Sequence, residues 1–177
     1  MDTYVASLAC VLCVQVAASD LYARRVSNRW LLAALAVLVG ILLWRGAEAA
    51  QWRAAGMGLL CAAALLPCYA IGWMGAGDVK FFALLGALFG PHGLLPIWII
   101  ASLLAGMHAV AVMTSPALKT WMPLPLRFAV ENSQSRLQAW PPHQRMLAAR
   151  RGRQGIPYAA YLAAAALACI FTGGLGA

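Results

Sequence analysis

Long apolar runs recur along this chain, and they restrict its fold more than any other feature. Several approach the roughly 20 residues that an α-helix needs to span the hydrocarbon core of a bilayer. Of the 177 residues, 63% are hydrophobic and only 10% are charged. A soluble domain would carry about a quarter charged residues. The sequence therefore predicts an all-α integral membrane protein.

Six apolar segments can be drawn, and we expect each to be a transmembrane helix of one polytopic domain that covers residues 1–177. Their ranges are Thr3–Ser19, Trp30–Ala47, Ala54–Trp73, Val79–Phe89, Leu94–Thr114 and Pro157–Leu175. The fourth segment is short, and a re-entrant piece would have a similar length. Length alone therefore leaves the number of spans open.

The basic residues favour six spans with the N-terminus outside. In that topology eleven of the thirteen basic residues are cytoplasmic: three in loop 21–29, Lys80, and seven in loop 115–156. Such a bias follows the positive-inside rule. If the fourth segment did not cross, the loop with seven basic residues would face outward.

Loop 115–156 is the one sizeable polar segment, and it contains five prolines and few apolar residues at helical spacing. We expect no independent fold from about forty such residues. Its positive charge would draw it to anionic lipid headgroups. The lipid bilayer, and not nucleic acid, is the partner that we expect for it.

Two acidic residues, Asp20 and Asp78, adjoin the apolar segments, whereas the other three lie in termini or loops. In the six-span topology both lie at the cytoplasmic membrane edge. Each could simply serve its own helix, Asp20 by pairing with Arg24 and Asp78 by sitting at a helix N-terminus. Two neighbouring carboxyls could instead share one proton and act on one water as acid and base.

Two glycines precede the second acid in the stretch MGAGDVKFF. Gly75 and Gly77 have no Cβ, so their backbone could adopt positive φ and come close to another chain. We expect them to leave room for an extended peptide substrate beside Asp78.

Three stretches carry a resemblance to a known family. GAGD (Gly75–Asp78) followed by Lys80 resembles the GxGD signature of polytopic aspartic proteases, and GDVK resembles the prepilin peptidases, or type IV leader peptidases. DLYARRVSN (Asp20–Asn28) is similar to their first catalytic motif, although Ser27 stands where many members have proline. GIPYAAYLAAA (Gly155–Ala165) resembles the start of their last helix.

This resemblance implies an aspartic endopeptidase of the bacterial inner membrane that removes the leader peptide from prepilins or pseudopilins. It implies Asp20 and Asp78 as catalytic residues, with no metal and no cofactor. The supporting or substrate-binding residues would be Gly75, Gly77, Lys80, Asn28, Pro157 and Tyr158. The length of the chain is similar to that of the tight-adherence (Flp-type, type IVb) pilus peptidases, so no methyltransferase domain is expected, and pilus-assembly proteins are further partners.

Polar and sulfur-containing residues inside the predicted spans have simpler interpretations. The five cysteines are most simply small packing residues. His108 is a candidate functional group because of its depth, although we expect a neutral ring that is bonded to a backbone carbonyl.

Two other functions stay open at this stage. A non-catalytic scaffold of the pilus machine would tolerate Asp20→Asn and Asp78→Asn. A small transporter would need more polar residues along its spans than this sequence contains.

Overall fold

The computed structural model describes residues 3–72, 74–121, 123–150 and 156–173. The regular elements found there are all helical, which confirms the predicted class. In chain order they are α1 (Thr3–Ala23), α2 (Asn28–Trp44), α3 (Ala49–Cys61), the 3₁₀-helix η1 (Ala62–Leu65), α4 (Leu66–Ala70), α5 (Ala76–Trp121), α6 (Leu124–Ala139), α7 (Pro141–Arg150) and α8 (Tyr158–Phe171).

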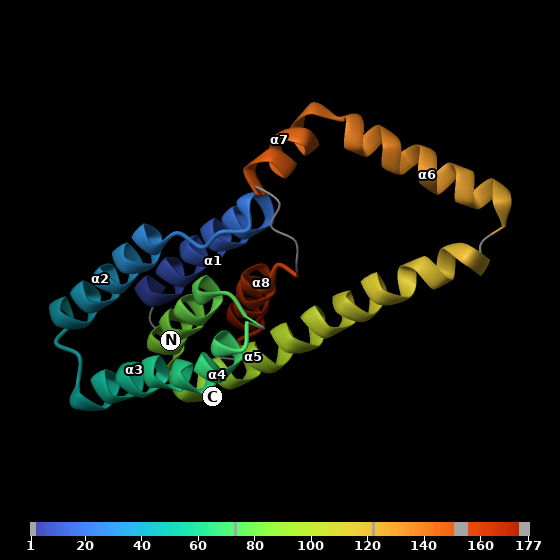
Figure 1. The fold of residues 1–177 in the computed structure, drawn as a ribbon. Coiled ribbons are helices and arrows are strands. Elements are labelled where there is room, and N and C mark those ends of the chain that lie inside the picture. The colour runs from blue at the N-terminus through green and yellow to red at the C-terminus, as the bar shows by residue number, and fades with distance from the viewer. Residues whose placement is uncertain (1–2, 73, 122, 151–155, 174–177) are drawn as a thin grey trace.

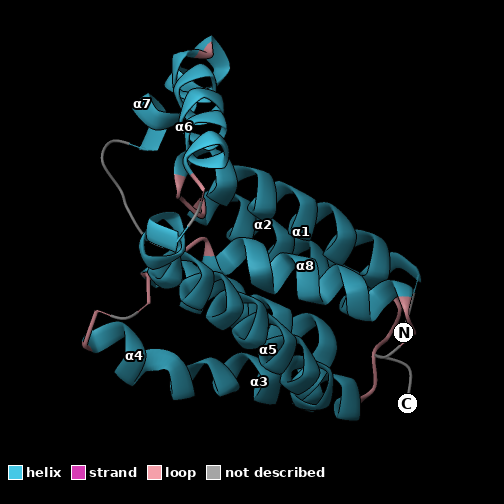
Figure 2. Cartoon of the chain, turned by 90° about the vertical axis from the view of Figure 1, so that its right-hand side faces the viewer, coloured by secondary structure: helices cyan, strands magenta, loops and turns pink. Residues whose placement is uncertain are grey.

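The bundle is organised around α5, which packs against α3 and α8, while α8 also packs against α1 (Figures 1 and 2). The largest fully buried side chains come mainly from α5 and α8: Phe81, Leu85, Leu94, Ile97, Leu162 and, from α1, Cys13. Helix α8 thus packs between α1 and α5.

Helix α5 consists of two helical stretches that meet at Gly90. This residue has φ 69° and ψ 177°, which is not helical. A positive φ suits glycine because it has no Cβ. The next residue, Pro91, has a fixed φ and is tolerated in the first turn of a new helix. The break predicted between the fourth and fifth apolar segments is therefore present.

Three helical stretches are long and apolar enough to cross a membrane: Thr3–Ala23, Ala49–Ala70 and Ala76–Ala117. Two more, Asn28–Trp44 and Tyr158–Phe171, are apolar but shorter. These findings support a membrane protein. Six spans and their orientation stay a prediction, to which the break at Gly90 adds support by dividing the longest stretch.

The third apolar segment begins earlier than expected, at Ala49 rather than Ala54. A capping box explains the start: the Glu48 backbone N–H donates to Oε1 of Gln51 at 3.2 Å, and the Glu48 side chain accepts from the backbone of Gln51. These bonds satisfy N–H groups that a helix start leaves free.

The third apolar segment then passes through η1 into α4, where Pro67 stands in the first turn and its ring and missing N–H interrupt the preceding helix. Helix α4 ends at Ala70, shortly before Gly72 with its left-handed φ of 76°. The expected end at Trp73 lies outside the described residues.

The basic loop is more helical than its composition indicated. Helix α5 continues seven residues beyond the expected end at Thr114, and α6 and α7 follow it. Figure 1 shows α6 well away from the bundle, and α7 returns to contact α1. None of the described side chains in α6 or α7 is buried. The described side chains of these helices thus form no core of their own, and the expectation that the loop does not fold alone stays a prediction.

Helices α3 and α5 cross at two glycines, Gly58 and Gly86. A Cβ on either residue would overlap the backbone carbonyl of the other. Small residues at such crossings let helix backbones approach closely, and close van der Waals contact drives helix association in lipid.

We predict that Gly86→Ala lowers the stability of the purified protein, because the added methyl group meets backbone that cannot rotate away. Overpacking of this kind costs about 1–3 kcal/mol. The apparent melting temperature in detergent should fall, while Gly56→Ala, whose Cβ meets nothing within 4 Å, should melt like the wild type. Equal melting temperatures for both variants would contradict the close crossing.

Candidate active site

Asp20 lies in the last turn of α1 and is the one buried charged side chain among the described residues, at 6% exposure. The helix ends three residues later, at Ala23, where Arg24 adopts a left-handed φ of 52° and donates its backbone N–H to the Asp20 carbonyl at 3.0 Å. This ending resembles the common left-handed helix cap, in which one N–H reaches a carbonyl of the last turn.

The carboxylate of Asp20 is bound by another helix. The backbone N–H of Ala160 donates to Asp20 Oδ2 at 3.1 Å. Ala160 is the third residue of α8, so its N–H is one of those that a helix leaves without an internal partner. A negative charge is unfavourable at the C-terminal end of α1 but favourable at the N-terminal end of α8. The N–H groups at the start of α8 therefore offset the unfavourable dipole that Asp20 meets at the C-terminal end of α1.

Asp78 lies in the first turn of α5. Its Oδ2 accepts the backbone N–H of Gly75 at 3.2 Å, as the acidic residue of a capping box does. The half-buried carboxyl also interacts with the backbone of Ala159 and with the charge of Asp20. The helix-capping interpretation is therefore correct for Asp78, but it is not complete, because both acids are also near the first turn of α8.

One cavity of about 870 Å³ receives both carboxyls. Its lining comes from the end of α1 and the following loop, from the start of α5, and from Ile156 just before α8. Two neighbouring carboxyls of which one is ionised and one is protonated can in principle act on one water. That arrangement supplies a general base and a general acid at one place.

The two glycines act differently from the sequence interpretation. Positive φ is found at Gly46, Gly72, Gly90 and Gly173 among the described glycines, and not at Gly75 or Gly77. A Cβ on Gly75 would lie 3.1 Å from Asp78 Oδ2, and one on Gly77 would lie 3.0 Å from Cβ of Val26. The missing Cβ atoms make room for parts of the same chain, the Asp78 carboxyl and the α1–α2 loop.

Asn28 and Lys80 are brought together although 52 residues separate them. Lys80 Nζ donates to Asn28 Oδ1 at 3.2 Å. Neither residue lines the cavity of the carboxyls. Both line a neighbouring hollow between α2 and α5. Although Asn28 and Lys80 are close in sequence to Asp20 and Asp78, they thus line a different hollow from the two acids.

Pro157 and Tyr158 shape the start of α8. Pro157 is the residue that precedes the helix, and its carbonyl accepts the Tyr161 N–H at 3.3 Å. The hydroxyl of Tyr158 forms a hydrogen bond with Ser102 Oγ at 3.1 Å, which joins α8 to α5. Both residues therefore contribute by placing α8, whose N–H groups reach the carboxyls.

His108 is bonded to a side chain rather than to the expected backbone carbonyl. The hydroxyl of Tyr161 lies 2.7 Å from His108 Nδ1. The histidine thus forms a second polar contact between α5 and α8. All five cysteines are free thiols.

The contribution of the Ala159 and Ala160 backbone is not visible in the sequence, because an amide N–H carries no side-chain signature. The signal that could have found them is GIPY before an apolar run, since proline just before a helix predicts where free N–H groups begin. The role of Ser102 is not visible either, because a single serine in an apolar span has many possible partners.

Comparison with known proteins decides the family. Residues 7–110 match the model of the type IV leader peptidase family, which is more than half of the chain. The chain belongs to the type IV leader peptidase family. No curated protein and no solved structure matches it.

Membership in this family supports a prepilin-type leader peptidase function and implies prepilin-like substrates. The matched region of this chain contains Asp20, Asn28, Gly75, Gly77, Asp78 and Lys80. It ends before α6, so the contribution of α8 to the carboxyls comes from the tertiary structure alone.

We predict that Gly77→Ala slows leader cleavage, because its methyl group would push Val26 and the α1–α2 loop away from the start of α5. Such overpacking costs about 1–3 kcal/mol. Val26→Gly removes the opposing Cβ, so the double variant should recover part of the lost rate, as a double-mutant cycle would reveal.

Gly106→Ala is the matched control for this cycle, because it lies on α5 and its Cβ would meet nothing within 4 Å. Additive effects of Gly77→Ala and Val26→Gly on the cleavage rate would show that the two residues are not in contact.

Proposed function

We propose that this chain is a membrane-embedded aspartic endopeptidase in which Asp20 and Asp78 form the catalytic pair. The observation that supports it most is that two carboxyls, 58 residues apart in the chain, line one cavity and interact electrostatically. A purely structural role explains the bond of each acid to a helix start. It does not explain why the two acids converge on the same space.

The reaction needs one water and the pair. The ionised carboxyl accepts a proton from the water, whose oxygen attacks the carbonyl carbon of the scissile peptide. The protonated carboxyl transfers its proton to the nitrogen of that peptide as the C–N bond breaks. The new carboxyl and amine then leave, and the pair again holds one proton. Because the two groups titrate together, we assign the proton to the pair and not to either aspartate.

Helix α8 has a positioning role in this mechanism. The Ala160 N–H donates to Oδ2 of Asp20 and so fixes the orientation of that carboxyl. Such a hydrogen bond is worth about 1.5–3 kcal/mol in the state in which its carboxyl is ionised. The bond from Gly75 orients Asp78 in the same way.

The substrate in this proposal is a prepilin or pseudopilin, cut after its leader on the cytoplasmic face of the inner membrane. Eleven basic residues on that side would hold six spans in the required orientation. Among prepilins we propose those of the tight-adherence (Flp-type) pilus, on the basis of the sequence resemblance. Pilus-assembly proteins would then receive the processed product.

The test is cleavage of a co-expressed Flp-type prepilin, followed by gel shift and mass spectrometry. We predict that Asp20→Asn and Asp78→Asn each lower cleavage by about 10²–10⁴-fold, the usual contribution of a general acid or base. Asparagine keeps the shape of aspartate, so both variants should still insert into the membrane in normal amounts.

Glu131→Gln is the matched control, because it makes the same chemical change on the exposed helix α6, where Glu131 pairs with Arg127 at 3.1 Å. It should cleave at the wild-type rate. Unchanged cleavage in both aspartate variants would reject the carboxyl pair as the catalyst. Failure of the wild type to cut every prepilin offered would favour a scaffold function instead.

A further inference from the structure

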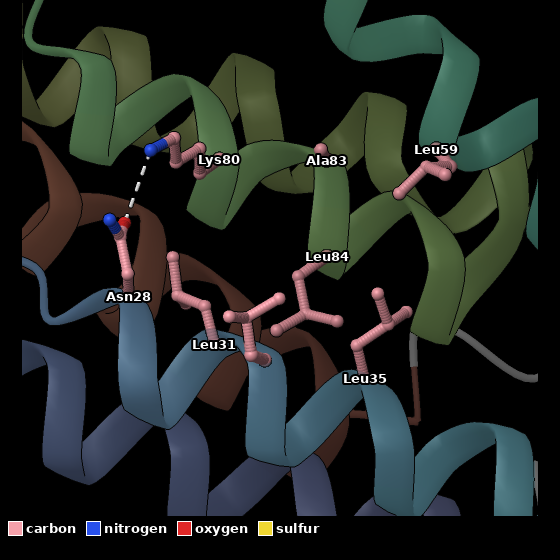
Figure 3. A pocket seen from close by; sticks show the side chains of 8 residues that line it. Asn28, Leu31, Leu35, Leu59, Lys80, Ala83 and Leu84 are labelled. Atoms are coloured by element: carbon pink, nitrogen blue, oxygen red, sulfur yellow. Dashed lines mark hydrogen bonds between the residues drawn. The ribbon is translucent and has the colours of Figure 1, made fainter.

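A second hollow lies beside the carboxyl cavity, between α2 and the first half of α5, and measures about 360 Å³. We call it the leucine groove. Six of its lining residues are aliphatic: Leu31, Leu32, Leu35, Leu59, Ala83 and Leu84. Figure 3 shows Leu31 and Leu35 of α2 directed toward α5, from which Leu84 points back, while Leu59 reaches in from α3.

One end of the leucine groove is polar. Its lining there consists of Asn28 and Lys80, which the hydrogen bond in Figure 3 joins at 3.2 Å. An ammonium group has three N–H donors, and the neutral amide of Asn28 takes one of them. The exposed Lys80 therefore brings a positive charge and further donors to the end of an otherwise aliphatic hollow.

This polar end adjoins the carboxyl cavity. Ser27 lines the carboxyl cavity and Asn28, the next residue, lines the groove. Asp78 lines the cavity and Lys80, two residues further along, lines the groove. The two hollows therefore meet at the starts of α2 and α5, and the groove leads away from the acids along both helices.

We infer that the leucine groove binds the apolar helix of the substrate, an inference that rests on the proposed function. The prepilins of the proposed function are expected, by the sequence resemblance, to carry an apolar helix that follows the cleavage site and stays in the bilayer. Such a helix has to enter from the lipid side, and the groove is open there because Leu32 is 65% exposed. Association in lipid depends on close van der Waals fit, which a hollow lined by branched side chains provides to the side chains of one helix face.

The lysine has a specific part in this binding mode. The substrate has to unwind where it presents its scissile bond, so backbone carbonyls there lose their helical donors. Unpaired carbonyls in apolar surroundings are costly. Lys80 lies at the end of the groove that adjoins the carboxyl cavity, and its ammonium group can donate to these unpaired carbonyls. In this binding mode the apolar helix of the substrate lies in the leucine groove, and an extended segment of the substrate leads from it to the two acids.

Photo-crosslinking in membranes tests this assignment. A photoreactive diazirine amino acid of about the size of leucine replaces Leu32, or Val37 as control, in an Asp78→Asn chain that is co-expressed with an Flp-type prepilin. Val37 is 49% exposed but lies about 140° around the helix from Leu32. We expect position 32 to crosslink to the apolar segment of the prepilin and position 37 to give little product.

Three outcomes overturn the inference. Equal crosslinking at both positions would show unspecific contact, and crosslinks from position 32 to lipid alone would show that an acyl chain fills the groove. In either case cleavage by the wild type, lost in Asp78→Asn, would leave the proposed function intact. If the wild type cuts no prepilin, both the function and the inference fail.

A kinetic variant adds a second readout. We predict that Leu32→Trp, which places a bulky indole ring in the groove, lowers kcat/KM for the full prepilin about tenfold. The change should come chiefly through KM, as expected when a binding contact is lost. Val37→Trp should leave kcat/KM unchanged. An effect of Leu32→Trp on kcat alone would contradict a binding role for the groove.

Discussion

The hydrogen bond between the Ala160 N–H and the Asp20 carboxylate is the interaction on which the site depends. It brings the last helix of the chain against the end of the first, at 3.1 Å. Asp20 is buried near the C-terminal end of its own helix, where the backbone dipole repels a negative charge. The free N–H groups at the start of α8 supply the compensation that α1 does not have. Removing this contact would leave a buried carboxylate without that donor.

Several features of the bundle serve this placement. Helix α8 is held to α5 by the hydrogen bonds of Tyr158 with Ser102 and of Tyr161 with His108. The close crossing of α3 and α5 at two glycines fixes the first half of α5, which carries Asp78. The α1–α2 loop fits against Gly77 through Val26. The carboxyl cavity is thus formed by helix ends that are anchored elsewhere in the core, a common way to hold reacting groups rigidly.

In the proposed binding mode, the carboxyl cavity and the adjoining leucine groove together receive one membrane-embedded peptide. The acids lie where helix ends concentrate polar backbone groups, and the groove lies where aliphatic side chains face the lipid. Lys80 stands at their boundary, hydrogen-bonded to Asn28 at 3.2 Å. This division matches the two parts of a prepilin-like substrate, an extended cleavage region and an apolar helix, and it places α6 and α7 outside the part of the molecule that would contact the scissile bond.

By itself the sequence determined the all-helical membrane class, the break near Gly90 and the two acids, because hydropathy and rare charges in apolar surroundings are visible residue by residue. It also indicated the family through three short motifs. Only the tertiary structure decided that α8 supplies backbone N–H groups to Asp20, that Gly75 and Gly77 make room for Asp78 and Val26, and that Lys80 faces Asn28 in a separate groove. Amide donors and missing Cβ atoms have no pattern of their own in a sequence. Their roles depend on which neighbour the fold brings close, and that neighbour is up to 140 residues away.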